Sequence, residues 1–304
     1  MIERATRRIR HTVKPAMLGI VPVARIGIPP LHLAHLTVHE ASPEELIDTA
    51  VSCGFAGVGM RITGFAPDND PMGLLGDRTR LRELRGRIAD HGLQLVNVCS
   101  YRLTDDIDVD VYAPVLEVCR RLGASTMLIT CFAEDEVRRQ DSVARLAEAA
   151  ARVDVKIGLE FFRTSKLRTL DEAEALRLAC PTANVGHIID ALHFFRAGHR
   201  PADLDRIPSN AVFGVQLCDG PTEIASAAAM REEVRKRQLP GYGALPLAAL
   251  MQRIPHEAPI EIEAPEAHLA GQTLRSRATR AHEAGVRFMQ ALQTRPKMRR
   301  SPRP

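Results

Sequence analysis

Residues 185–198 read VGHIIDALHFFRAG, and the first half of this stretch is a largely apolar run that ends in Asp190. Such a run is typical of a buried β-strand, because both faces of a central parallel strand are covered. A carboxylate at the end of that strand is costly to bury unless it is paired or bound to a metal ion. The fold must therefore explain both the strand and the partner of Asp190.

The same pattern extends outward in both directions along the chain. Short apolar runs predict strands at 31–38, 57–62, 93–101, 125–132, 156–162, 184–193, 212–219 and 259–265. Each run precedes a segment with helical spacing or a short polar turn. The first such helix has clear signals, since Ser42 and Glu45 form a capping box and Gly54 is a stop. The sequence thus contains eight strand–helix units.

Strands that alternate with helices are expected to be parallel and joined by right-handed crossovers. Eight units in about 250 residues match a (β/α)8 TIM barrel, so we predict one barrel domain over residues 30–292. An open doubly wound sheet would normally carry a glycine-rich phosphate loop, and neither G-x-G-x-x-G nor G-x-x-x-x-G-K-[ST] occurs in the sequence. Residues 1–29 and 293–304 are predicted to be short basic terminal extensions.

Composition and charge describe an ordinary globular chain of 304 residues, with 45% hydrophobic and 26% charged residues. The formal net charge is +4, but residues 1–15 contribute +4 and residues 294–304 contribute +5, which leaves −5 for the body. Because the positive charge lies in the terminal segments, the body gives no support to nucleic-acid binding. A small-molecule partner is expected instead, and a homo-oligomer is left open.

The sequence predicts a cytoplasmic protein. No apolar run approaches the eighteen residues of a membrane span, and the basic start lacks the apolar core of a secretory signal. The six cysteines form no C-x-x-C pair, and free cysteine in an apolar context behaves as a small hydrophobe. A reducing compartment is the simplest interpretation.

Polar residues stand at the carboxyl ends of four successive predicted strands, where the catalytic groups of a TIM barrel are placed. These residues are Glu160, Asp190, Gln216 and Glu263. Four oxygen donors on adjacent strands would converge at one point of the barrel mouth. An oxygen-rich set of this kind suits Mn²⁺ or Mg²⁺ better than zinc, with Co²⁺ and Zn²⁺ kept as alternatives.

Each of these residues also has a simpler interpretation. A strand-end carboxylate is often a salt-bridge partner or a helix cap, and a buried Gln216 can hydrogen-bond a neighbour. Glu261 competes with Glu263 for the last position, because both have the same strand parity. Glu263 is preferred since it lies nearer the end of its strand. Four such residues on successive strands favour the metal site.

The chain resembles the xylose isomerase-like TIM-barrel superfamily, the sugar phosphate isomerase/epimerase group. The resemblance rests on IGLEFF, GHIIDALHFFRAG, VFGVQLCDG, LPGYGALPL and IEIEAPE. It implies that Glu160, Asp190 and Glu263 bind a metal ion. It also implies that His193, three residues after the aspartate, contacts the substrate or lies beside the metal.

Two positions depart from the family pattern. The usual strand-seven ligand is a histidine, where this chain has Gln216, and the usual P-G-E-G loop reads PGYG at 240–243. Glutamine on strand seven resembles the 3-dehydroshikimate dehydratase branch. The resemblance therefore implies either an isomerase or epimerase, or a lyase.

Other side chains are assigned more loosely. Arg61 is expected to hold an anionic or hydroxyl group of the substrate, with an internal ion pair as the alternative. Arg237 is a further candidate for substrate binding because it can reach over the barrel mouth, although the charge run REEVRKR favours a solvated side chain. His32 and His35 are expected on the first strand, and lone histidines there are more often core residues.

The function predicted from these residues is a metal-dependent isomerase or epimerase of a small polyhydroxy carbonyl compound, placing the chain in carbohydrate metabolism. The metal would stabilise an enediolate, with Glu160 and Glu263 as acid and base and His193 orienting the substrate. Loss of a β-hydroxyl would instead give a dehydratase of the 3-dehydroshikimate or inosose type. More remote alternatives are an apurinic-site endonuclease, whose relatives carry many more histidines, and a non-catalytic binding protein.

Overall fold

The computed structural model describes residues 27–294 except 224–225, 227–228, 230–231 and 267–270. The basic segments predicted at 1–29 and 293–304 thus lie outside the described residues, apart from 27–29 and 293–294. Within the described part of the chain, no helix combines the length and apolarity that crossing a membrane requires.

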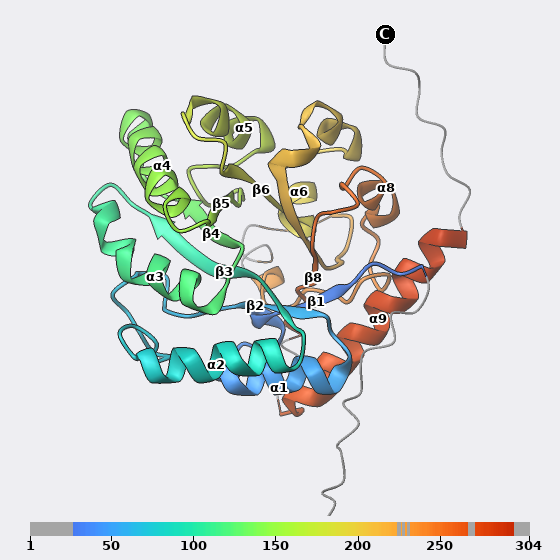
Figure 1. Ribbon diagram of the computed structural model, residues 1–304. Coiled ribbons are helices and arrows are strands. Elements are labelled where there is room, and N and C mark those ends of the chain that lie inside the picture. The colour runs from blue at the N-terminus through green and yellow to red at the C-terminus, as the bar shows by residue number, and fades with distance from the viewer. Residues whose placement is uncertain (1–26, 224–225, 227–228, 230–231, 267–270, 295–304) are drawn as a thin grey trace, which may run out of the picture.

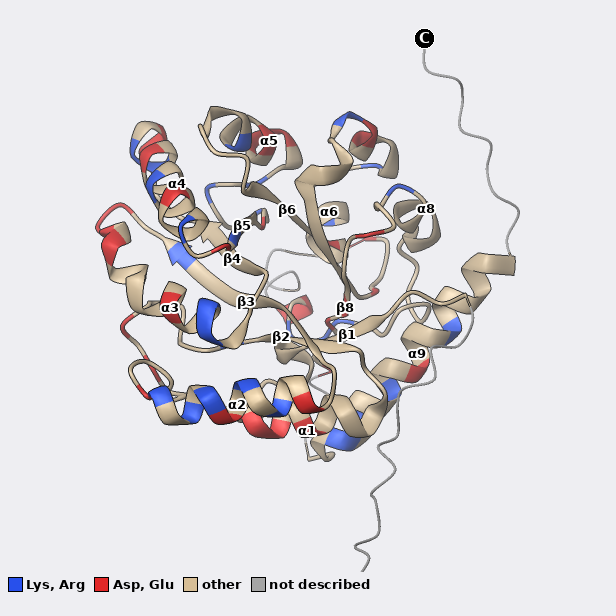
Figure 2. Cartoon of the chain, viewed as in Figure 1, with Lys and Arg blue, Asp and Glu red and all other residues tan. Residues whose placement is uncertain are grey.

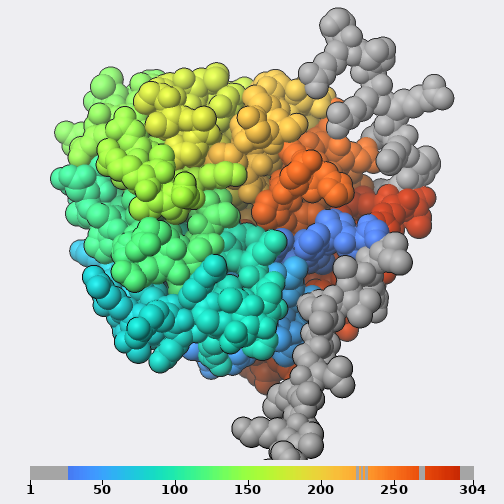
Figure 3. Space-filling view, viewed as in Figure 1, coloured from blue at the N-terminus to red at the C-terminus, as the bar shows by residue number. Residues whose placement is uncertain are grey.

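Eight parallel strands form a closed barrel in sequence order, and β1 pairs with β8 to complete it (Figure 1). The strands are β1 Leu31–Ala34, β2 Gly57–Met60, β3 Gln94–Leu103, β4 Thr126–Cys131, β5 Lys156–Leu159, β6 Val185–Asp190, β7 Val212–Leu217 and β8 Ile260–Ile262. The predicted (β/α)8 TIM barrel is therefore confirmed. In the space-filling view of Figure 3, the start of the described chain lies beside its C-terminal part, in agreement with the pairing of β1 with β8.

Helices surround the barrel. The α-helices are α1 Pro43–Cys53, α2 Arg78–Asp90, α3 Ala113–Leu122, α4 Glu136–Ala151, α5 Leu170–Ala179, α6 Ala191–Arg196, α8 Leu247–Met251 and α9 Leu274–Thr294. The 3-10 helices are η1 His35–Val38, η2 Val109–Tyr112, η3 Pro201–Arg206 and η4 Ser209–Ala211. Figure 2 shows charged residues gathered on outer helices such as α2, whereas the strands are mostly uncharged. The apolar faces of the helices pack on the barrel and form its core.

Local signals explain where α1 begins and ends. The Ser42 hydroxyl accepts from the backbone N–H of Glu45, and the Glu45 carboxylate accepts from the backbone N–H of Ser42. Gly54 ends the helix in the left-handed conformation at φ 84°, which glycine adopts without steric cost. The capping box and the stop expected from the sequence are both present.

Most strands are shorter than predicted, and after two of them the following residues turn into helices. The strand expected at 31–38 ends at Ala34, and His35 begins the 3-10 helix η1 instead. The strand expected at 184–193 ends at Asp190, whose carboxylate caps helix α6 by accepting from the backbone N–H of His193 at 3.0 Å. An apolar run does not distinguish a strand from a short buried helix, and here the aspartate marks the boundary.

The register of the last strands sets the level of the polar residues at the barrel mouth. Asp190 on β6 is directly paired with Gln216 on β7, which in turn is paired with Glu261 on β8. Glu263 lies two residues further along and donates its backbone N–H to the carbonyl of Leu217. Strand parity therefore directs Glu261 and Glu263 to the same face at different depths.

Candidate active site

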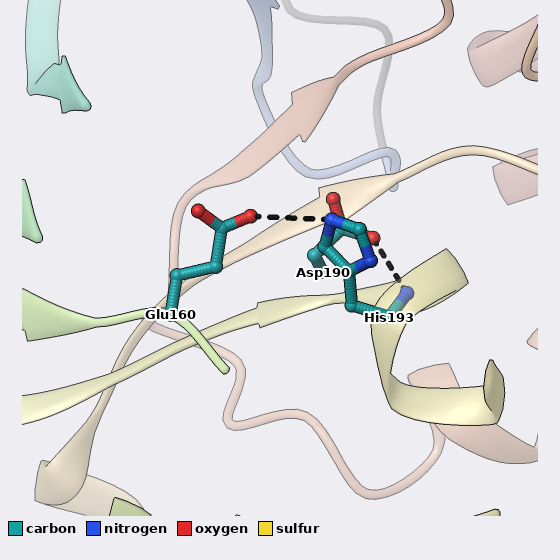
Figure 4. A group of neighbouring side chains, drawn as sticks. All are labelled: Glu160, Asp190 and His193. Atoms are coloured by element: carbon teal, nitrogen blue, oxygen red, sulfur yellow. Dashed lines mark hydrogen bonds and ion pairs between the residues drawn. The ribbon is translucent and has the colours of Figure 1, made fainter. Parts of the chain in front are cut away.

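Three side chains converge at the ends of β5 and β6, as Figure 4 shows. Glu160 follows β5, Asp190 ends β6 and His193 lies in the first turn of α6. One potential ligand atom from each residue lies within 4.8 Å of the others, and Glu160 and Asp190 are buried. The His193 Nε2 atom is 3.8 Å from the Glu160 Oε1 atom. Two carboxylates and an imidazole in this arrangement can hold a divalent cation.

The guanidinium of Arg237 joins the ends of β6 and β8. Its Nη1 donates to the Asp190 Oδ2 atom at 2.6 Å and also donates to the Glu263 Oε2 atom. Its Nη2 is 3.5 Å from the Nε2 atom of His193, so this contact is at the limit of a hydrogen bond. One buried cation thus lies between two carboxylates and offsets part of their negative charge.

This position corrects the interpretation of REEVRKR as a solvated charge run. The Arg237 side chain is only 2% exposed, and the two carboxylates it contacts are also buried. The residue lies just before Gln238, which forms an antiparallel bridge with Asp219. The backbone is therefore turned inward at this point, which the composition of the run does not indicate.

Gln216 and Glu263 are in direct contact. The Gln216 Nε2 donates to the Glu263 Oε1 atom at 3.0 Å, so both Glu263 oxygens have partners. The Gln216 Oε1 atom is buried and accepts no hydrogen bond from any described residue. An unpartnered buried amide oxygen is unfavourable, and a cation or a substrate hydroxyl would satisfy it.

The sequence-predicted ligands are thus brought together at the barrel mouth, in two overlapping groups. Glu160 and Asp190 lie with His193, whereas Gln216 and Glu263 bond to each other and are connected to Asp190 by Arg237. Sequence reasoning expected His193 near the metal only through the family resemblance. It did not predict the bridge formed by Arg237.

Burial and mutual repulsion favour the protonated forms of the two glutamates. Burial raises the pKa of Glu160 well above its usual range, and the negative charges of Asp190 and Glu263 add to the effect. Burial also raises the pKa of Glu263, to about 7, although the adjacent Arg237 acts in the opposite direction. A glutamate with a pKa near neutrality suits general acid–base catalysis.

Asp190 and His193, in contrast, both favour their deprotonated forms. Burial opposes ionisation of Asp190, but attraction to Arg237 and the hydrogen bond from the backbone N–H of His193 favour it, and the pKa of this carboxyl is lowered. Burial lowers the pKa of His193 to about 4, despite the neighbouring Asp190. The imidazole is therefore neutral near pH 7, which is the form that binds a metal ion or accepts a hydrogen bond.

Glu261 lies on β8 two residues before Glu263 and contacts a different partner. The Asn97 Nδ2 donates to the Glu261 Oε2 atom, and burial raises the pKa of Glu261 to about 8. This side chain is therefore a neutral acid near pH 7. The arrangement separates Glu261 from the carboxylates that Arg237 joins.

The two histidines of the first unit differ in position. His32 lies in the core between the Ile260 carbonyl and the side chain of Gln94. His35 lines the cavity, where its Nε2 donates to the Ala41 carbonyl and its Nδ1 accepts the backbone N–H of Arg61 at 2.9 Å. His35 therefore supports the segment that carries Arg61, with its ring in the neutral form.

A cavity of about 910 Å³ opens above these residues and includes Glu160, His193, Gln216, Arg237 and Glu263 in its wall. The ring of Phe162 also lines it and stacks on the ring of His193, with centroids 5.0 Å apart. An aromatic wall of this kind excludes water from one side of the site. The cavity size suits a small-molecule ligand.

The segment after β7 covers one side of the cavity and is fixed by a buried ion pair. Arg196 of α6 donates from Nε and Nη2 to the carboxylate of Glu233, and its Nη1 and Nη2 also donate to the carbonyls of Thr222 and Pro221. Sequence reasoning did not select Arg196 or Glu233. Arg196 lies in a short helix, and no periodic pattern in the sequence marked either residue.

The PGYG loop follows this segment and contributes no acid. The hydroxyl of its Tyr242 accepts a hydrogen bond from Arg287 on α9, at 2.9 Å, and its side chain is exposed. The carboxylate of Asp219 holds the loop by accepting from the backbone N–H groups of Gly220, Gly241 and Leu245. The acid expected from the family pattern has therefore been replaced by a residue outside the cavity.

The donor set fits a divalent cation. Glu160, Asp190 and His193 supply three convergent ligand atoms, and the buried Gln216 Oε1 atom has no partner among the described residues. The Arg237 guanidinium contacts the Oδ2 atom of Asp190 and the Oε2 atom of Glu263. A cation at this site would therefore have Arg237 beside it.

The fold and the site define a class: a parallel eight-stranded barrel with acidic and amide side chains at the carboxyl ends of successive strands. Residues 47–292 match the family described as xylose isomerase-like TIM barrel. The chain belongs to this family. No curated protein matches the chain.

Three solved structures illustrate the similarity of fold. The IolI protein with a bound zinc atom is 18% identical, with a TM-score of 0.70 over 88% of this chain and 100% of that one. A probable 3-DHS dehydratase, AsbF of Bacillus anthracis, is 13% identical, with a TM-score of 0.64 over 88% and 100%. A D-allulose 3-epimerase of a Methylomonas species is 13% identical, with a TM-score of 0.63 over 87% and 97%.

The barrel also matches part of a longer chain. A xylose isomerase-like TIM barrel/4-hydroxyphenylpyruvate dioxygenase fusion protein is 19% identical, with a TM-score of 0.68 over 84% of this chain. The match spans only 42% of the fusion protein. At these identities the structures show a shared fold.

Proposed function

We propose that this chain is a divalent-metal-dependent isomerase or epimerase acting on a small polyhydroxy carbonyl compound. The observation that carries the proposal is the pair of buried glutamates, Glu160 and Glu263, on either side of the strands that hold Asp190 and Gln216. Burial raises the pKa of both glutamates, which equips them to exchange protons rather than to remain fixed charges. The substrate is proposed to occupy the cavity beside them.

The two glutamates have different roles in this proposal. Glu263, with a pKa of about 7, is present in both protonation states and removes the proton next to the substrate carbonyl. Glu160, whose pKa is raised further, holds a proton that it can return to the opposite face of the enediolate. Neutral His193 accepts or donates a hydrogen bond at a substrate oxygen and keeps the reacting carbons between the carboxyls.

Glu160, Asp190 and His193 would hold the cation, with the carbonyl oxygen of Gln216 and the carboxylate of Glu263 as further donors. When bound, a divalent cation supplies Lewis-acid stabilisation to adjacent carbonyl and hydroxyl oxygens. The oxygen-rich part of the set favours Mn²⁺ or Mg²⁺, while the imidazole admits Co²⁺ or Zn²⁺. The zinc atom in the IolI structure supports the proposal of a divalent ion in this fold.

A dehydratase is the second candidate, favoured by the raised pKa of Glu160. A neutral carboxylic acid can protonate a departing β-hydroxyl, which converts the same enediolate into an unsaturated product. Gln216 on the seventh strand resembles the 3-dehydroshikimate dehydratase branch, and AsbF shares the fold. Both reactions begin with the same proton abstraction, so the metal ligands do not distinguish them.

Solvent deuterium distinguishes the two candidates. Purified protein is loaded with Mn²⁺ and incubated in D₂O with ketoses, inosose-type cyclitols and 3-dehydroshikimate. An isomerase or epimerase should incorporate deuterium at carbon, detected by NMR and mass spectrometry. A dehydratase should release a product that absorbs in the ultraviolet. Neither outcome with any of these carbonyl substrates would contradict the proposal of an enolising enzyme and favour a binding protein.

A further inference from the structure

Three of the four acidic side chains that line the cavity are paired with an arginine. Glu233 is paired with Arg196, Glu263 with Arg237, and Glu266 with Arg280. The fourth, Glu160, lies with Asp190 and His193. Each of these acids therefore already has a neighbour other than the arginines considered next.

Four arginines line the same cavity without a carboxylate partner among the described residues. They are Arg61, Arg102, Arg163 and Arg235. Positive charges at the cavity wall also affect the neighbouring His39, which is part of that wall. Burial lowers the pKa of His39, and the charges of Arg277, Arg61 and Arg235 lower it further. The unmatched charge at the mouth is thus positive and concentrated, although the body of the chain is acidic.

Two of these arginines are held together by one aromatic ring. The guanidinium carbons of Arg61 and Arg102 lie 5.3 Å and 4.0 Å from the centroid of the Phe65 ring. The backbone carbonyl of Phe65 accepts the N–H of Arg102, which connects the backbone of Phe65 to β3. Arg102 also lies 5.0 Å from the centroid of Phe132. Aromatic faces therefore support both guanidinium groups.

The N–H groups of these two guanidiniums remain available. Neither side chain donates a hydrogen bond to any residue in the described part of the chain, and the backbone N–H of Arg61 is fixed separately by His35. A contact with an aromatic face leaves the edge of the guanidinium free to donate. Two planar donors on one wall are suited to a carboxylate or phosphate, which accepts bidentate hydrogen bonds.

We propose that the substrate carries a carboxylate or phosphate group, which Arg61 and Arg102 bind while its polyhydroxy carbonyl end lies beside Glu160 and Glu263. The second half of this statement rests on the proposed function, whereas the anion subsite does not. A neutral sugar would leave both guanidiniums without an acceptor. The proposal assigns Arg102 a binding role that the sequence did not suggest, and it makes the substrate anionic.

Three matched probes test the subsite without any reaction. Glycerol 3-phosphate, D-glycerate and glycerol share a three-carbon polyol frame and differ in the phosphate, the carboxylate or neither. Their binding to the full chain, without added metal, is measured by isothermal titration calorimetry at low ionic strength. Glycerol should not bind detectably, and at least one anion should bind. The tighter anion identifies whether the group is a phosphate or a carboxylate.

Variants locate the binding. Arg61→Gln and Arg102→Gln should each weaken binding of the tighter anion by about tenfold or more, because each removes a charge-assisted hydrogen-bond donor. Arg152→Gln is the matched control, since Arg152 is exposed at the end of α4 and lies outside the cavity wall. It should bind as the parent chain does. Added salt should weaken binding to the parent protein.

The proposal is overturned if glycerol binds as tightly as the anions, if neither anion binds, or if both Gln variants bind the anions normally. Equal loss in Arg152→Gln would show non-specific charge attraction and would also overturn it. Circular dichroism checks that each variant is folded. If a Gln variant fails to fold, the Lys variant replaces it, and it should bind more weakly than the parent because the planar fork is lost. Since no turnover is involved, a negative deuterium experiment would leave this result intact.

Discussion

Glu160 is the side chain on which proton transfer depends most directly in the proposed function. Its carboxyl is buried beside Asp190 and lies 3.8 Å from the Nε2 atom of His193. Burial, followed by repulsion from Asp190, raises its pKa well above the usual range. It can therefore hold a proton near neutral pH, which glutamine of the same volume cannot exchange.

We expect Glu160→Gln to lower turnover on the order of 10²- to 10⁴-fold, the usual contribution of a positioned acid or base. Deuterium incorporation at the substrate carbon should fall in parallel. Glu257→Gln is the control, because Glu257 is exposed between α8 and β8. The assignment fails if Glu160→Gln retains parent turnover, or if denaturant unfolding shows that its loss of activity is a loss of the fold.

Glu261 offers a separate test at this scale, through the dependence of stability on pH. Burial raises its pKa from 4.5 to about 8, so the folded chain retains a proton that the unfolded chain has released above pH 4.5. The folded state then binds more protons, and the free energy of unfolding falls as pH rises from about 4.5 to about 8. The contribution of Glu261 to the free energy of unfolding is fully present below this pH range and is lost as the pH rises through it.

We expect Glu261→Gln to lose less stability than the parent chain between about pH 5 and pH 8, because the amide cannot ionise. It should also keep a hydrogen bond with Asn97, whose Nδ2 bonds to the Glu261 Oε2 atom in the parent chain. Urea unfolding at several pH values measures the difference. The free energy of unfolding of the variant should still fall somewhat with rising pH, since the pKa of Glu263 is also raised. Identical slopes for parent and variant would contradict the expectation.

At the scale of single elements, β2 passes close to the buried side chain of Glu261. A Cβ atom added at Gly59 would overlap the Glu261 Oε1 atom and would lie 2.8 Å from the Asn97 Oδ1 atom. A larger residue at this position would displace the ends of two buried side chains from β3 and β8, which are hydrogen-bonded to each other.

Gly59→Ala should therefore lower the free energy of unfolding by about 1–3 kcal/mol or more, the cost of overpacking a well-filled core. The matched control is Gly86→Ala in α2, where an added Cβ meets no atom within 4 Å. That change should stabilise the chain by about 0.5–1 kcal/mol, because alanine is the better helix former. Denaturant unfolding compares both variants. A neutral Gly59→Ala would show that the wall of the barrel adapts more readily than the contacts imply.

The elements also show what sequence patterns can and cannot predict. The alternation of strands and helices sufficed for the barrel, because eight apolar runs with helical segments between them have few other packings. The predicted ends of the strands were less accurate. The run 31–38 is mostly apolar at both ends, yet the chain turns into η1 at His35. Periodicity is a local signal, whereas the end of a strand is decided by contacts with its neighbours.

The candidate site was predictable to the extent that it follows from strand order. Glu160, Asp190, Gln216 and Glu263 each stand at a strand end, so a parallel barrel necessarily brings them to one edge. Arg237 was not predictable in the same way. It lies in an irregular segment, and its burial depends on ion pairs with residues 47 and 26 positions away in the sequence. No local pattern encodes such contacts.

At the scale of the whole molecule, Arg237 connects parts of the barrel that are distant in the sequence. Its guanidinium joins the end of β6 to the residue after β8, and its own backbone belongs to the segment that covers the cavity. Burial opposes its charge, but attraction to Asp190 and Glu263 raises its pKa. Its positive charge is therefore permanent and balances the carboxylates that hold the barrel mouth together.

We expect Arg237→Gln to lower the free energy of unfolding by about 3–5 kcal/mol, because it leaves buried carboxylates without their counter-charge. If those carboxylates also form the cation site, Mn²⁺ should raise the stability of the variant more than that of the parent chain. The reason is linkage: a ligand stabilises the folded state according to its affinity, and removing a neighbouring positive charge increases the affinity for a cation.

Thermal and urea unfolding with and without Mn²⁺ measure both effects, and calorimetry measures the metal affinity directly. Arg152→Gln at the end of α4 serves as the control, because it removes an exposed arginine and should change neither quantity. A variant as stable as the parent would show that the buried ion pairs contribute little to the closed barrel mouth. A variant that is less stable but binds Mn²⁺ with the same affinity as the parent would show that the cation does not lie at Asp190 and Glu263. The ligands would then be side chains that Arg237 does not contact.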